Sequence, residues 1–194
     1  MKGPLFYAKI LLFGEYGIIK NSKGLSIPYN FYRGALKTSE NPITQDSHLK
    51  LMAFCSYLKK LPDSIVSFDW KRLNEDLDNK MYFDSSIPQG YGIGSSGALV
   101  ASIYDKYALD KITVLENLTK EKLQHLKIIF AAMESFFHGK SSGLDPLNSY
   151  LSLPILINSQ DHIEPTGIPS QNPDGKGAVF LLDSGIVGET APMV

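Results

Sequence analysis

The apolar residues near the N-terminus follow the pattern of β-strands. Residues 5–13 are rich in aromatic and branched side chains and are followed by a glycine, which predicts a buried strand that leads into a turn. Residues 16–19, a turn at 21–24 and a second extended run at 25–36 come next. This order predicts a β-hairpin or meander with Pro28 at an edge position, because proline cannot donate a hydrogen bond to a sheet.

The hydrophobic period changes to that of an α-helix after residue 45. Asp46 or Ser47 can cap the N-terminus of this helix, Pro62 stops it, and the spacing predicts about four turns. The predicted buried face consists of Leu51, Phe54, Leu58 and Leu61.

Four short strands are predicted further along the chain. Two of them, 64–70 and 80–86, are separated by the charged segment 71–78. Two late strands are predicted at 155–157 and 178–182. The segment 160–176 between the late strands contains three prolines and two glycines and is given no element.

Two helices are predicted between these strands. Leu99, Ile103 and Tyr107 share one helical face. The second helix has Thr119 as its N-cap and Gly139 as its stop signal. Its apolar stripe consists of Leu123, Leu126, Phe130, Met133 and Phe137.

Composition narrows the class of protein. The chain has 194 residues, 43% of them hydrophobic, a net charge of -1 and a pI of about 6.4, so one packed domain is expected and no electrostatic footprint for nucleic acid or a membrane surface exists. Cys55 is the only cysteine, which suits a reducing compartment, and no run approaches the ~18 apolar residues of a membrane span. We expect a cytoplasmic protein whose partner is a small molecule, and a homodimer is allowed.

The segment 88–102 organises the rest of the chain. It places glycines at alternate positions, then two serines, and then a helical pattern. Glycines let backbone N–H groups turn toward a ligand, and the helix start near Ser95 adds unpaired amides and a positive dipole end. This arrangement predicts a loop that binds phosphate.

Two common phosphate loops fit less well. A Walker A loop needs a lysine where Ala98 stands. Residues 92–97 match the dinucleotide pattern G-x-G-x-x-G, and the strand-like run 112–115 ends at Glu116, which could imitate a ribose contact. The preceding segment 84–88 is polar and ends in proline, whereas the dinucleotide loop follows a buried apolar strand.

The other parts that phosphoryl transfer needs are also present. The reaction requires a phosphate cradle, a divalent cation and a group that positions the acceptor hydroxyl. Ser96 and Glu134 offer the oxygen ligands that magnesium prefers, Asp145 is the candidate base, and Lys9 can stabilise the transferred group.

Each of these residues also has a plainer explanation. Lys9 can be an edge or snorkelling residue, Glu134 a solvated helix residue, and Asp145 the cap of a helix that begins at Pro146. Glu134 does border the apolar stripe of its helix, where a carboxylate needs partners. The four histidines, which lack any short metal-binding spacing, are His48, His125, His138 and His162.

Three motifs, in family order, resemble those of the GHMP kinases. Residues 88–98 resemble the central motif P-x-x-x-G-[LI]-G-S-S-[AG]-A. Residues 8–16 look like the first motif of mevalonate kinases, [PG]-K-[VI]-x-L-F-G-E-H. Glu134 followed by residues 139–145 is similar to the helix glutamate and G-x-x-S-G-[IVL]-D of the same family.

The resemblance implies a role for each matched residue. It implies Asp145 and Lys9 as catalytic residues, Ser96 and Glu134 as magnesium ligands, and ATP and Mg²⁺ as cofactors. The residues implied at the nucleotide phosphates are Gly90, Gly92, Ile93, Gly94, Ser95, Ser96 and Gly97. Those implied on the substrate side are Lys9, Glu15, Tyr16 and, by a weaker similarity, Thr190.

The resemblance also implies the fold and the domain. The expected fold is α+β, ribosomal protein S5 domain 2-like, with a mixed sheet and a left-handed βαβ unit that general topology rules disfavour. The chain contains no T-G-A-G-G-type segment, which the family carries in a second domain. Residues 1–194 are therefore expected to be the N-terminal ATP- and substrate-binding domain of a larger kinase, and a poor catalyst alone.

The function implied is an ATP-dependent kinase that phosphorylates an alcohol, with mevalonate, an isoprenoid precursor, as the expected acceptor. Tyr16 replaces a histidine that often contacts mevalonate, and Gly188 and Glu189 stand where a basic residue is common. Another GHMP kinase, acting on phosphomevalonate, homoserine or a sugar, and a non-catalytic nucleotide-binding module therefore remain alternatives. A dinucleotide oxidoreductase is the third choice.

Overall fold

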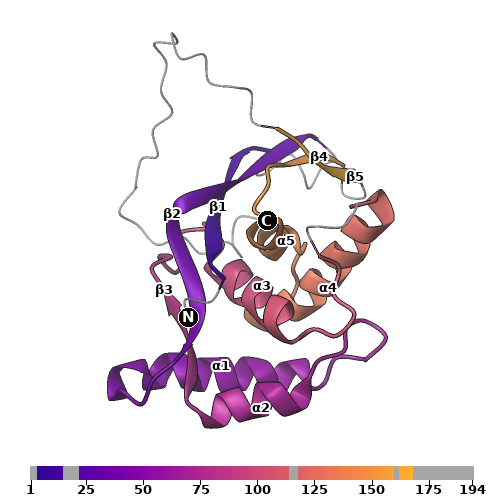
Figure 1. Cartoon of the computed structure of the whole chain (residues 1–194). Coiled ribbons are helices and arrows are strands. Elements are labelled where there is room, and N and C mark those ends of the chain that lie inside the picture. Colours follow the sequence, from indigo (N-terminus) through magenta and orange to yellow (C-terminus); the bar gives the residue numbers. More distant parts are fainter. Residues whose placement is uncertain (1–3, 15–21, 114–117, 160–161, 168–194) are drawn as a thin grey trace.

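The computed structural model describes residues 4–14, 22–113, 118–159 and 162–167. Figure 1 shows a sheet with helices packed beside it. The strands are β1 (Phe6–Phe13), β2 (Gly24–Thr38), β3 (Met81–Ser85), β4 (Ile155–Ser159) and β5 (His162–Pro165). The helices are α1 (Gln45–Leu58), α2 (Trp70–Asp78), α3 (Ser95–Tyr107), α4 (Lys120–His138) and α5 (Leu144–Leu151). The predicted mixed α/β fold is confirmed.

Strand β2 is the centre of the sheet. It pairs with β1 on one side, while on the other side residues 34–38 pair with β3 and residues 24–26 pair with β4. Strand β5 then pairs with β4. Every pair in the described part of the chain is antiparallel, so the prediction of a mixed sheet is wrong there. Strands β3 and β4 both run antiparallel to β2, but they pair with different parts of it and not with each other. The left-handed βαβ unit therefore stays a prediction.

Pro28 lies in the central strand without breaking it. Its register partner in β1 is Lys9, whose N–H donates to Ile93 O at 2.9 Å, away from β2. In such an antiparallel pair the N–H of the opposite residue also points outward. The outer side of β2 at Pro28 lies between the segments paired with β4 and β3, so no ladder hydrogen bond is lost.

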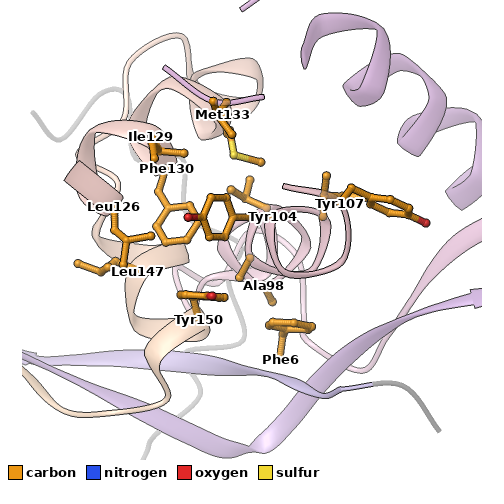
Figure 2. Packing of buried hydrophobic residues seen from close by; sticks show 14 of the residues in the cluster. Phe6, Ala98, Tyr104, Tyr107, Leu126, Ile129, Phe130, Met133, Leu147 and Tyr150 are labelled. Carbon is orange, nitrogen blue, oxygen red and sulfur yellow. The ribbon is translucent and has the colours of Figure 1, made fainter. Parts of the chain in front are cut away.

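The core lies where α3, α4 and α5 meet. Figure 2 shows the rings of Tyr104, Phe130 and Tyr150 packed against one another, with centroids 5.0–5.6 Å apart in edge-on arrangements. Phe6 brings β1 to the same cluster. Because α3 and α5 share this core with β1, the start of each helix is held at a fixed place beside that strand.

The strongest helix signals are confirmed. The Thr119 hydroxyl accepts the N–H of Lys122 at the start of α4, and Gly139 ends this helix with φ +70°. Phe137, expected in the core, is 37% exposed instead. In α1 neither Asp46 nor Ser47 is the cap, because a 3₁₀ turn at Pro42–Thr44 precedes the helix and Thr44 is its N-cap.

The predicted strand at 64–70 is wrong. Only Phe68 forms a bridge there, to Ala108, and α2 begins at Trp70 with the Asp69 carboxylate accepting the N–H of Arg72. The charged segment 71–78 is helical because Leu73 is fully buried and Asp76 accepts the Tyr107 hydroxyl at 2.6 Å.

Other predictions fall in the last third of the chain. Strand β5 lies inside the segment 160–176, for which no element is predicted. Residues 112 and 113 form no strand, and the predicted strands at 16–19 and 178–182 lie outside the described residues. None of the helices in the described part is long and apolar enough to cross a membrane.

Candidate active site

The glycine segment leads directly into the start of α3. Gly92 and Gly94 have φ of +66° and +82°, a region that L-residues with side chains rarely adopt, and Gly94 is the N-cap of α3. A Cβ on Gly94 would also lie 3.0 Å from Lys9 Cγ. The loop therefore places the N-terminus of α3 beside a buried lysine. The first N–H groups of a helix have no partner within the helix and favour anions.

Lys9 and Asp145 form an ion pair at this place. Lys9 Nζ lies 3.0 Å from Asp145 Oδ1, and the two side chains are 8% and 33% exposed. Asp145 lies in the first turn of α5 but does not cap it, since the N-cap is Gly143 in a left-handed conformation with φ +73°. The explanation of Asp145 as a helix cap is therefore wrong, and Lys9 is not at a solvated edge.

Glu134 lies buried on α4 with a hydroxyl at each oxygen. Ser96 Oγ donates to Glu134 Oε1 at 2.9 Å, and Ser141 Oγ donates to Oε2 at 2.5 Å. Burial raises the pKa of Glu134 to about 7, and the negative charge of Asp145 adds to the rise. The two serine hydrogen bonds and the charge of Lys9 oppose it.

Ser96 and Glu134 fit a magnesium ion. Neighbouring oxygens around an octahedral ion with ~2.0–2.1 Å bonds lie about 2.9 Å apart. The Ser96 Oγ to Glu134 Oε1 distance is 2.9 Å, so both can bind one ion without moving apart. The described residues contain no group of three or more His, Cys, Asp or Glu side chains around one point. A magnesium ion held with nucleotide phosphates needs only one or two protein carboxylates.

Two residues of the site were missed from the sequence. Ser141 holds Glu134 and accepts the Gly143 N–H at 3.0 Å, and His138 Nε2 lies 3.1 Å from Ser96 Oγ. His138 follows Glu134 by four residues on α4, a spacing that puts both on one helical face and could have indicated it.

The structure brings most candidate residues together. Asp145 connects the two parts of the site, because its carboxylate contacts Lys9 and its negative charge raises the pKa of Glu134. The gathered residues are Lys9, Ile93, Gly94, Ser96, Gly97, Glu134 and Asp145. Their chemical roles remain predictions, and Glu15, Tyr16 and Thr190 lie outside the described residues.

Gly97 sets the distance between α3 and α5. A Cβ there would lie 2.7 Å from Asp145 C and from Pro146 N, which are backbone atoms that cannot turn aside. We expect Gly97→Ala to lower the free energy of unfolding by about 1–3 kcal/mol, because the helices must separate. Urea unfolding measures the change. Gly167→Ala, where a Cβ meets nothing, is the control, and equal stability of both variants would contradict this account of the packing.

Comparisons with known proteins place this arrangement in a family. Residues 57–152, which include Ser96, Glu134 and Asp145, match the family described as GHMP kinases N terminal domain. No curated protein sequence matches the chain significantly.

Solved structures of mevalonate kinases are similar to the chain. The enzyme of methicillin-resistant Staphylococcus aureus MRSA252 is 19% identical, with a TM-score of 0.43 over 83% of this chain and 53% of that one. The Methanococcus jannaschii enzyme is 14% identical, with a TM-score of 0.49 over 88% and 57%. The L. major enzyme, in complex with R-mevalonate, is 18% identical, with a TM-score of 0.45 over 85% and 55%. The chain thus spans a little over half the length of these enzymes. The match identifies residues 57–152, just under half of the 194 residues, as a GHMP kinase N-terminal domain.

Proposed function

We propose that this protein is an ATP-dependent kinase that transfers the γ-phosphoryl group to the hydroxyl of a small alcohol. The observation that carries the proposal is the ion pair of Lys9 and Asp145, 3.0 Å long, beside the glycine N-cap of α3. The site thus combines the Asp145 carboxylate, the buried Lys9 ammonium group and a helix N-terminus that favours phosphate. Phosphoryl transfer uses this set of groups.

One part of the site would bind the nucleotide and its metal ion. The amides at the start of α3 would hold the nucleotide phosphates, and Ser96 and Glu134 would hold Mg²⁺. When bound there, the ion would supply positive charge that offsets the negative charge of the phosphates in the transition state.

Asp145 and Lys9 would act on the acceptor. The Asp145 carboxylate takes the proton of the acceptor hydroxyl as the oxygen bonds to the γ-phosphorus and ADP departs. Lys9 keeps the carboxylate in place through its 3.0 Å contact. Its positive charge also favours the alkoxide character of the attacking oxygen, since a charge in a dry site acts more strongly than in water.

Mevalonate is the acceptor we propose to test first. The support is the similarity of residues 8–16 to the first motif of mevalonate kinases. Phosphomevalonate, homoserine and sugars are the next acceptors in order, because other GHMP kinases use the same central loop.

The test is ADP release by the complete protein with MgATP and each acceptor. Release that depends on mevalonate supports the proposal in full, and release with another alcohol keeps the kinase and corrects the acceptor. Metal-dependent binding of ATP without transfer to any acceptor would make the protein a nucleotide-binding module.

A further inference from the structure

The Ser96 hydroxyl has two hydrogen-bond partners among the described residues. One is Glu134 Oε1 at 2.9 Å, and the other is His138 Nε2 at 3.1 Å. His138 is the last residue of α4 and is exposed, so its ring reaches Ser96 from the solvent side of the site.

A hydroxyl can donate only one hydrogen. Without an ion, the Ser96 proton can point to Glu134 while a His138 Nε2–H donates to Ser96 Oγ. If Ser96 and Glu134 bind the same ion, both direct lone pairs at the ion. The Ser96 proton must then turn away from Glu134 and needs another acceptor.

The second carboxylate oxygen of Glu134 is held by hydrogen bonds that do not involve Ser96. This oxygen accepts the Ser141 hydroxyl, which in turn accepts the Gly143 N–H at 3.0 Å. That chain of hydrogen bonds holds Oε2 and leaves Oε1 for the ion. The acceptor within reach of the Ser96 proton is then His138 Nε2.

We propose that His138 is a positioning residue. When magnesium is bound, His138 Nε2 accepts a hydrogen bond from the Ser96 hydroxyl and so directs the Ser96 lone pair at the ion. This inference rests on the proposed function, because it requires Ser96 and Glu134 to be the metal ligands. His138 itself stays outside the coordination shell, since magnesium prefers oxygen ligands. Partners of this kind typically change metal affinity 10–100-fold.

The experiment measures Mn²⁺ binding to the full chain by electron paramagnetic resonance, in the presence of the non-hydrolysable ATP analogue AMP-PNP. We expect His138→Ala to weaken Mn²⁺ binding about 10-fold and His138→Gln, whose side-chain oxygen can accept the same proton, to recover most of it. His125→Ala, an exposed histidine of the same helix, is the matched control and should bind as the wild type does.

A double-mutant cycle identifies the route of the effect. In a Ser96→Ala background, His138→Ala should change Mn²⁺ affinity less than about twofold, because the residue acts through Ser96. An equal loss in both backgrounds, or direct coupling between Mn²⁺ and the His138 nitrogen in pulsed spectra, would overturn the inference. Wild-type affinity of His138→Ala would overturn it as well, while the proposed function would survive. Absence of AMP-PNP-dependent Mn²⁺ binding in the wild type would overturn both.

Discussion

Asp145→Asn in the complete protein is expected to lower kcat by about 10²–10⁴-fold, with little change in the KM for ATP. The amide keeps the size of the side chain but cannot take the proton of the acceptor hydroxyl. It also removes the negative charge that lies 3.0 Å from Lys9 Nζ. The nucleotide side of the site, at Ser96 and Glu134, is left intact, and binding of ATP should persist for this reason.

The measurement is steady-state ADP release over a range of acceptor concentrations. Asp46→Asn is the matched control, because Asp46 also pairs with a lysine, Lys50 at 2.7 Å, but on the exposed surface of α1. Circular dichroism checks that both variants fold. Wild-type turnover by folded Asp145→Asn would exclude this residue as the base.

The elements that sequence reasoning identified have strong local signals. Helix α4 carries a capping threonine, an apolar stripe and a terminal glycine, and these agree with the structure except at Phe137, the exposed last residue of the stripe. In the segment 64–70 the apolar Val66, Phe68 and Trp70 alternate as they would in a strand, but the conformation depends on partners distant in sequence, such as Ala108 and Tyr107. Tertiary contacts of that kind leave no local pattern.

The same distinction holds at the site. The glycine segment and the residues Lys9, Glu134 and Asp145 were found because each belongs to a motif of several residues. Ser141 and His138 were missed because Ser141 occupies a variable position of its motif and His138 precedes that motif, and a serine or histidine at such a place has many ordinary explanations. Their meaning comes from the side chain that they contact, which only the packing of α3 against α4 and α5 determines.

Glu134→Gln is expected to have two opposite effects. It should weaken metal-dependent nucleotide binding by at least about 100-fold, since a charged ligand is replaced by a neutral amide. Without divalent cations it should stabilise the fold at pH 8, by on the order of 1–3 kcal/mol, because the wild type then holds a buried carboxylate charge at 3% exposure.

The pH window of the stabilisation follows from the pKa of about 7 in the folded chain, raised above the ordinary value of 4.5. Between these values the unfolded chain has released the proton that the folded chain retains, so wild-type stability falls as pH rises. Glu134→Gln lacks this fall, and its advantage should be absent below pH 4.5 and complete above pH 7. Urea unfolding in EDTA at pH 4.5 and pH 8 measures this difference in stability.

The control on the same helix is Glu121→Gln, whose carboxyl has a pKa lowered by its own backbone N–H and by Thr119. That substitution should give no gain at pH 8. An advantage of Glu134→Gln that did not change with pH would contradict the burial of an ionisable carboxyl, and would instead indicate a better packed amide.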